Sequence, residues 1–213
     1  MSLPIAREGR GIVLGGLALT TTLFAIGGRA VRNIALATLA ATGALAFFFR
    51  DPERFVVPID NGILAPADGK VIRIDETEAP EFFEGPVRCV SIFMSLTDCH
   101  VNRAPVGGKV SYQSTADGGF LAAWDDRASD ENRRAYLGIM GEPPALTKQV
   151  AGFAARQIVQ YPRVGDFVEQ GDRIGIIMLG SRVDVYFPLD LRLMVNVGDA
   201  TIGGVTALAE RIS

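Results

Sequence analysis

The chain has 213 residues, which is enough for a short N-terminal element followed by one domain with a hydrophobic core. Lysine and arginine total 21 against 24 acidic residues, and the net charge of −3 argues against nucleic acid as the main partner. Its two cysteines, Cys89 and Cys99, are too few for a disulfide scaffold and lack metal-ligand spacing, so no metal is expected, and His100 is the single candidate for a catalytic imidazole.

The first 54 residues contain two uncharged apolar runs, at residues 11–28 and 34–49, separated by RAVRN. As helices these runs are about 24–27 Å long, slightly short of a hydrocarbon core of ~30 Å. They predict a membrane-associating helical hairpin over residues 1–54, and a buried hairpin in a soluble protein is the alternative. A cleaved signal peptide is disfavoured, because the second run follows at once and no small-residue cleavage site precedes it.

Arginines on either side of the predicted hairpin indicate its orientation. A hairpin places both outer flanks on one side of the membrane, and positively charged residues favour the cytoplasmic side. Four arginines lie in the flanks and two in the turn: Arg7, Arg10, Arg50 and Arg54 against Arg29 and Arg32. The pattern therefore favours a main domain on the cytoplasmic face of the cell membrane.

Residues 55–213 change to short apolar runs punctuated by glycine, proline and aspartate, which is typical of an all-β sandwich or barrel. Residues 118–146 are more polar and less regular, and we expect a long loop with a helical piece there. The expected strands are residues 69–74, 87–95, 109–113, 153–160, 173–179, 183–187, 191–197 and 205–209.

Two internal echoes support the β interpretation. APADGKV at residues 65–71 recurs as APVGGKV at 104–110, and VGDFVEQG at 164–171 recurs as VGDATIGG at 197–204. The VGD units predict tight turns, since glycine supplies positive φ and aspartate accepts backbone hydrogen bonds. Paired units of this kind indicate a hammerhead-like sandwich with pseudo-twofold symmetry.

Hammerhead-like sandwiches also occur in biotinyl and lipoyl carrier domains, which present a lysine at a hairpin tip. The comparable turn of this chain offers Ser181 and Arg182 instead of lysine. A non-enzymatic, lipoyl-like membrane adaptor therefore stays open as an alternative function, and it predicts an intact chain.

Residues 176–187 read IIMLGSRVDVYF, a strand-forming run interrupted by Gly180, Ser181 and Arg182. A serine hydroxyl that follows glycine can attack the preceding carbonyl carbon, which glycine leaves sterically open. The product is an ester, and elimination across the serine Cα–Cβ bond then breaks the chain and leaves dehydroalanine. Loss of ammonia leaves a pyruvoyl group. A Gly-Ser pair alone carries little weight, because nearly every protein has one.

LGSRVDVYFP at residues 179–188 resembles the self-processing site of the phosphatidylserine decarboxylases, in their short form that reads Gly-Ser-Arg. Five further blocks resemble the family in family order: FFRDPER, APADGKV, SLTDCHVNRAP, VAGFAARQIV and, more loosely, DENRRAYLGI. The resemblance covers roughly residues 45–209. It departs from the common pattern at Leu179 and Cys99, neither of which needs to react.

The resemblance implies that Ser181 is the precursor of a covalent pyruvoyl cofactor and that the bond between Gly180 and Ser181 is cleaved. Cleavage would convert a zymogen into a large chain, residues 1–180, and a small chain, residues 181–213, that form a heterodimer. His100 is implied as the proton shuttle, because imidazole, with a reference pKa of about 6.5, suits this task at neutral pH.

Asp68 is implied to orient the imidazole, as the acid of an Asp-His-Ser arrangement does. A turn aspartate is the alternative, although the echo carries Gly107 at this position, so the turn itself does not require a carboxylate. Asp184 is read as structural. The candidates for substrate binding are Arg182, Asn102 and Arg103. The residues expected on a solvated or lipid-facing surface are Arg127, Arg133 and Arg134.

The implied reaction belongs to phospholipid biosynthesis. The amine of phosphatidylserine in the membrane would condense with the pyruvoyl ketone to a Schiff base, lose CO₂ into this electron sink, and leave as phosphatidylethanolamine. A pyruvoyl decarboxylase of a soluble amino acid is a second alternative, which the hairpin disfavours. Exposed sheet edges make a higher oligomer possible.

Overall fold

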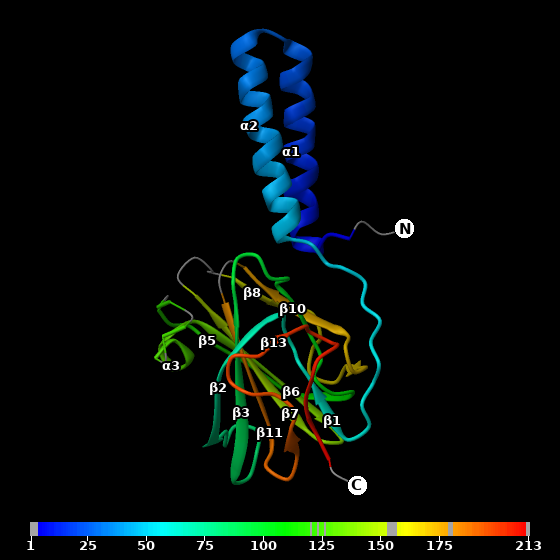
Figure 1. Cartoon of the computed structure of the whole chain (residues 1–213), viewed down its shortest axis with the longest axis vertical. Helices are drawn as coiled ribbons and strands as arrows, with labels where there is room; N and C mark the ends of the chain where they lie inside the picture. The colour runs from blue at the N-terminus through cyan, green and yellow to red at the C-terminus, as the bar shows by residue number, and fades with distance from the viewer. Residues whose placement is uncertain are drawn as a thin grey trace. The chain divides into compact units, whose positions relative to one another are not determined.

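The computed structural model describes residues 4–119, 121–122, 124–125, 127–152, 157–178 and 181–211. The chain divides into two compact units, Met1–Glu53 and Arg54–Ser213, and each is described by itself (Figure 1). The first unit is a helical hairpin, and the regular elements described in the second are β-strands apart from one short helix.

The hairpin consists of α1 (Arg7–Ile26) and α2 (Arg29–Phe48), each of 20 residues. At 1.5 Å per residue each helix is about 30 Å long, which equals the thickness of a hydrocarbon core. Both helices exceed the expected apolar runs, and the expected RAVRN turn is wrong, because α2 begins at Arg29. The chain reverses instead at Gly27 and Gly28, whose φ angles of 76° and 89° suit glycine.

Small residues form the contact between the two helices. Gly16 of α1 leaves room for Thr42 of α2, and the buried hydroxyls of Thr20 and Thr42 donate to carbonyls one turn earlier in their own helices. Close packing of small residues is typical of helix pairs in membranes. By length and composition, both helices could cross a bilayer. Large apolar side chains are exposed along both: Ile12, Leu14, Leu17, Leu19, Phe24, Ile26, Ile34, Leu36, Leu39, Leu45 and Phe47.

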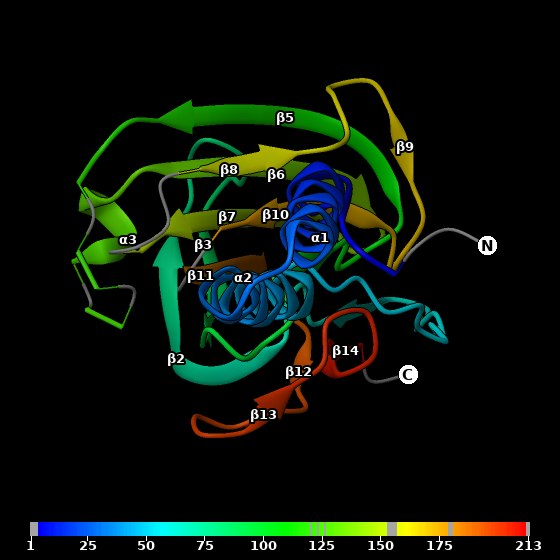
Figure 2. The same cartoon turned by 90° about the horizontal axis from the view of Figure 1, so that it is seen from above.

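The second unit contains one large curled sheet, seen in Figure 2, and two small ones. The large sheet has the order β13-β2-β3-β11-β7-β6-β5-β9, and each strand is antiparallel to its neighbours. Its strands are β2 (Gly69–Glu78), β3 (Pro86–Met94), β5 (Gly108–Ala116), β6 (Arg134–Gly141), β7 (Ala145–Ala151), β9 (Phe167–Val168), β11 (Ser181–Pro188) and β13 (Ala200–Thr201). The small sheets have the orders β1-β14-β12 and β4-β10-β8. Their strands are β1 (Gly62–Leu64), β4 (Val101–Arg103), β8 (Ile158–Gln160), β10 (Arg173–Ile177), β12 (Arg192–Leu193) and β14 (Ala207–Glu210).

The mainly β expectation is confirmed, but the expected loop over residues 118–146 is wrong in its second half. It contains β6 and the start of β7, which form an antiparallel hairpin. In β6 the apolar residues Ala135, Leu137 and Ile139 alternate inward, and this period of two is the strand signal that the surrounding polar residues obscured. The helical piece exists as α3 (Ala128–Glu131). The expected strand over residues 191–197 is reduced to β12.

The internal echoes form equivalent turns, which confirms the pseudo-repeat. Gly165 and Gly198 share a φ of 103°. The backbone N–H of Gly165 donates to Val110, and that of Gly198 donates to the equivalent Val71. The two halves also interlock, because the N–H of Leu64 donates to Pro105 and that of Arg103 donates to Pro66. This reciprocal exchange holds the two repeats as a single sandwich.

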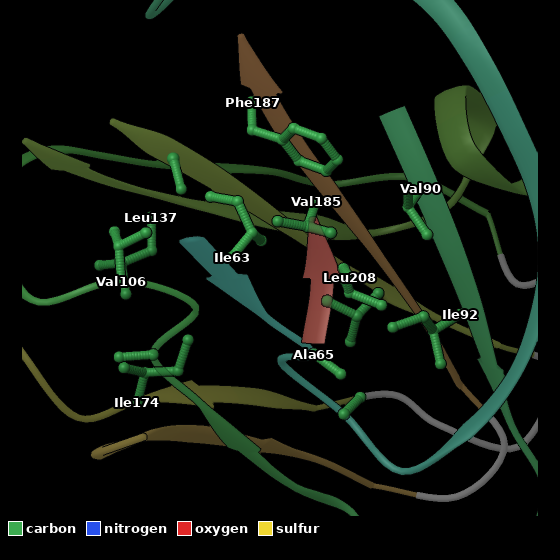
Figure 3. Packing of buried hydrophobic residues seen from close by; sticks show 14 of the residues in the cluster. Ile63, Ala65, Val90, Ile92, Val106, Leu137, Ile174, Val185, Phe187 and Leu208 are labelled. Atoms are coloured by element: carbon green, nitrogen blue, oxygen red, sulfur yellow. The ribbon is translucent and has the colours of Figure 1, made fainter. Parts of the chain in front are cut away.

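The hydrophobic core lies between the large sheet and the two small sheets (Figure 3). Val90 and Ile92 of β3 and Val185 and Phe187 of β11 point into it, together with Leu208 of β14. Core packing therefore reaches from the N-terminal half of this unit to its last strand.

Candidate functional site

β11 begins at Ser181, so the predicted processing site lies at the start of a strand in the interior of the large sheet. This strand pairs along its length with β3 and over six residues with β7, opposite Met94 and Ala151 at its first position. Gly180 and Leu179 lie outside the described residues. The peptide bond on the amino side of Ser181 thus directly precedes a strand that is held on both edges.

The Ser181 side chain is completely buried on the core side of β11. Its hydroxyl donates to the thioether sulfur of Met94, at 3.3 Å, and the amide nitrogen of Asn102 lies 3.6 Å from the same sulfur. A thioether is a weak acceptor. The hydroxyl and the Asn102 amide therefore share one weak acceptor, and a better acceptor in this space would attract both.

His100, also completely buried, directly precedes β4. Its Nδ1 lies 3.0 Å from the backbone carbonyl oxygen of Asp98. Because a carbonyl only accepts, Nδ1 carries the hydrogen and the lone pair of the neutral ring belongs to Nε2. The Asp98 carboxylate accepts from the N–H and hydroxyl of Ser95, both at 2.7 Å, and fixes the turn that carries this carbonyl.

Asp68 has partners that the sequence did not suggest. Its two carboxylate oxygens accept from the guanidinium of Arg54, and the N–H of Gly203 donates to Oδ1 at 2.8 Å. Asp68 was expected to orient His100, but the contacts described for its carboxylate are with Arg54 and Gly203. The described contact of the His100 ring is with the backbone carbonyl of Asp98, and the role of Asp68 toward His100 stays a prediction.

Arg182 leaves β11 on the opposite face from Ser181, because successive strand residues alternate. It is 2% exposed, its Nε donates to Asp184 at 2.6 Å, and one terminal nitrogen donates to the hydroxyl of Ser91 at 2.8 Å. Ser129 of α3 donates to the other oxygen of Asp184 at 2.7 Å. The described partners of Arg182 lie on the face away from Ser181, and its role in substrate binding stays a prediction.

Charges around Arg182 offset the cost of its burial. Burial alone would lower the pKa of Arg182, but the charge and hydrogen bond of Asp184, with smaller contributions from Cys89 and Tyr186, together raise it, so the guanidinium stays charged. Burial and the negative charge of Asp184 together raise the pKa of the neighbouring Cys89 thiol to about 12. A cavity of about 100 Å³ adjoins this cluster. Cys89 is therefore a protonated thiol at physiological pH.

The remaining candidates lie on β4. Asn102 is completely buried and its amide oxygen accepts from Gln149 at 2.7 Å. Arg103 is 4% exposed and donates to the backbone carbonyl of Gly171 at 3.0 Å. The structure thus brings Ser181 and Asn102 to one sulfur atom and places Arg103 in the contact between the repeats.

Sequence reasoning missed Met94 and Gln149, which contact Ser181 and Asn102. Met94 is one more apolar residue of the expected strand over residues 87–95, and Gln149 lies in no expected strand. Only the pairing of β11 with β3 and β7 brings them to the site. Among the described residues, no group of three His, Cys, Asp or Glu side chains is placed to share a metal ion.

Comparison with known proteins identifies a family for this arrangement. A family model described as phosphatidylserine decarboxylase matches residues 42–209. A phosphatidylserine decarboxylase proenzyme of Symbiobacterium thermophilum is 45% identical over 164 residues, 76% of each chain. A proenzyme of the same description from Desulfotalea psychrophila is 38% identical, and the match covers 98% of this chain and 97% of that protein. Another from Syntrophus aciditrophicus is 41% identical, and the match covers 96% of each chain. The chain belongs to the phosphatidylserine decarboxylase family of enzymes.

Proposed function

We propose that this chain converts phosphatidylserine to phosphatidylethanolamine and CO₂ with a pyruvoyl group that it makes by cleaving itself between Gly180 and Ser181. The observation that carries the proposal is the burial of the Ser181 hydroxyl at the first residue of an interior strand, in a chain of this family. Buried hydroxyls are ordinarily held by strong acceptors, whereas this one has a thioether. Such a hydroxyl can turn toward a reacting carbonyl at little cost.

The cleavage needs only atoms of the chain and one water molecule. The Ser181 oxygen bonds to the carbonyl carbon of residue 180, the C–N bond breaks, and the nitrogen takes a proton, which yields an ester and a free amine. A base then removes the Cα proton of residue 181, and the Cβ–O bond breaks with residue 180 leaving as a carboxylate. The resulting enamine tautomerises to an imine, and water replaces its nitrogen, which departs as ammonia.

His100 is the proposed base for these proton transfers. Its Nδ1 is committed to the Asp98 carbonyl, so Nε2 takes up protons, and this tautomer is the one that a general base requires. His100 directly precedes β4, the strand that carries Asn102, and both side chains are completely buried. Asp68 remains a predicted participant that would act through Arg54 and Gly203 in the described arrangement.

The two product chains are proposed to stay together as a heterodimer. Residues 181–213 contribute β11 to the large sheet, β13 to its edge, and β12 and β14 to a small sheet. Val183, Val185, Phe187 and Leu208 from this segment belong to the common core. Separation would expose these side chains to water, at roughly 1.5–3 kcal/mol for each large one.

The pyruvoyl group supplies a carbonyl that takes up the electron pair released when CO₂ leaves. The serine that would form it lies in a fully buried space, and exclusion of water favours loss of a charged carboxylate as neutral CO₂. Asn102 is the proposed donor to the substrate, while Arg103 and Arg182 support the strands around it. The hairpin is proposed to hold the enzyme at the cytoplasmic face of the membrane that contains the lipid.

The direct experiment incubates purified full-length chain with phosphatidylserine vesicles and measures CO₂ release. Cleaved chain that releases CO₂ from the lipid supports the proposal. An uncleaved, folded wild type would favour a membrane adaptor. A cleaved chain that is inactive on the lipid but decarboxylates a free amino acid would favour the soluble-substrate alternative.

A further inference from the structure

We infer that Gln149, Gln160 and Gln113 form a side-chain amide chain that positions Asn102 as an N–H donor beside Ser181. The inference rests on the proposed self-cleavage and assigns that reaction three positioning residues. The carrying observation is an unbroken, one-directional series of hydrogen bonds that ends at the sulfur shared with Ser181.

The series connects strands of two different sheets. Gln113 of β5 donates to the amide oxygen of Gln160 on β8 at 2.9 Å, and Gln160 donates to Gln149 on β7 at 3.1 Å. Gln149 donates to the amide oxygen of Asn102 on β4 at 2.7 Å. Asn102 in turn directs its nitrogen at Met94. Each amide accepts through oxygen from the previous side chain and donates through nitrogen to the next.

A backbone carbonyl sets the direction of the whole series. Gln113 also donates to the carbonyl oxygen of Pro162, at 3.2 Å. Because a carbonyl only accepts, this contact fixes which end of the Gln113 amide is nitrogen, and every later amide follows. Asn102 consequently presents N–H groups, and not its oxygen, to the space beside Ser181.

The structure makes room for this series. Gln149 is 1% exposed and Asn102 is completely buried. Gly175 of β10 lies against the Gln149 amide, where a Cβ would come within 3.1 Å of Nε2. A buried amide without a hydrogen-bond partner carries a desolvation penalty. Reversal of one amide in the series would place two N–H groups, or two oxygens, against each other and leave both without a partner.

The donor has a chemical use at this place. Attack by Ser181 turns the carbonyl oxygen of residue 180 into an oxyanion, and that carbonyl is bonded to the Ser181 nitrogen. Among the described residues, the acceptor of the Asn102 amide before the reaction is a thioether, so Asn102 gains more from an oxyanion than from this ground-state partner. Interactions that strengthen in the transition state accelerate the reaction, and the amide chain holds the donor ready.

The test measures the rate of self-cleavage and the melting temperature of full-length variants. In Gln149→Glu the carboxylate cannot donate to Asn102, so Asn102 turns its oxygen toward Ser181. Gln149→Met removes the hydrogen bond to Asn102 without favouring the reversed orientation of the Asn102 amide. Gln170→Met is the matched control, since the described hydrogen bonds of Gln170 are with Ile59, Gly62 and Pro105 and involve no member of the series.

Removal of one oxyanion donor slows such reactions about 10²–10³-fold, and we expect this for Asn102→Ala. We expect Gln149→Glu to approach that loss, Gln149→Met to lose about tenfold, and Gln170→Met to cleave at the wild-type rate. Gln149→Met in the Asn102→Ala background should cost little more, because Gln149 acts through Asn102.

Three results would overturn the inference while wild type still cleaves. The first is that Gln149→Glu cleaves at the wild-type rate. The second is that Gln170→Met slows cleavage as much as a Gln149 variant with the same loss of melting temperature. The third is that the effects of Asn102→Ala and Gln149→Met on the rate are fully additive. A wild type that does not cleave would instead sink the proposed function itself. Hydroxylamine, which traps the ester, gives a second readout: less trapped ester is expected in Gln149→Glu.

Discussion

Replacing Asp184 with asparagine tests whether Arg182 supports the strand that begins at Ser181. The change leaves the guanidinium, 2% exposed, without its counter-charge. Breaking a buried ion pair by removing one partner costs about 3–5 kcal/mol. Unfolding entropy of about 2.1 cal/mol/K per residue, over roughly 160 residues of this unit, converts this to about 9–15 °C of melting temperature.

The measurement uses the Ser181→Ala background, so that every sample is one uncut polypeptide in detergent. Asp190→Asn is the matched control, because the Asp190–Arg211 pair is largely exposed and should contribute less than about 1 kcal/mol. The double change Arg182→Met with Asp184→Leu should recover much of the loss, since it buries no charge. If Asp184→Asn melted within a few degrees of its parent, the buried pair would not stabilise β11.

Further expectations concern the Arg54–Asp68 ion pair, the Cys89 thiol and the helical hairpin. Arg54→Met and Asp68→Asn should slow self-cleavage equally if Asp68 acts through Arg54, and only Asp68→Asn should slow it if Asp68 contacts His100. In the folded protein the pKa of Cys89 is about 12, which is above its value of 9.0 in the unfolded chain. The contribution of the protonated thiol to the free energy of unfolding is therefore complete below pH 9 and is lost as the pH rises toward 12, at up to about 1.4 kcal/mol per pH unit. The stability gap between wild type and Cys89→Ala, from denaturant unfolding at pH 8 to 11, should therefore narrow; a constant gap would contradict this. Leu17→Arg on the exposed apolar face of α1 should release protein from membranes in carbonate extraction, and unchanged retention would argue against insertion of that face.

The sequence predicted the fold correctly where a single residue type determines the local backbone conformation. The VGD turns were predictable because glycine and aspartate act within their own turn, and Gly165 and Gly198 do share one conformation. β6 was missed because its apolar residues are separated by tyrosine, glycine and methionine and follow a charged stretch. The alternation of Ala135, Leu137 and Ile139 is a weak local signal, and the pairing with β5 and β7 that completes the strand cannot be read from neighbouring residues.

In the candidate site, too, some residues could be identified from local sequence, whereas their partners depend on which strands pair. Ser181 and His100 stand out from their motifs, and burial of both is compatible with that interpretation. The partners of Asp68, Arg182 and Asn102 depend on which strands become neighbours, so spacing along the chain could not supply them. Arg182 illustrates the limit, because its partners Asp184 and Ser91 follow from strand alternation and strand pairing, which its motif does not contain.

Intact-mass analysis of purified wild-type and Ser181→Ala chains tests the central claim most directly. The account predicts that wild type separates under denaturing conditions into residues 1–180 and 181–213, with the small chain lighter than a simple hydrolysis product by the mass of ammonia. Ser181→Ala should remain one uncut chain. Active wild type with a single unbroken mass, or a small chain that begins with an intact serine, would contradict it.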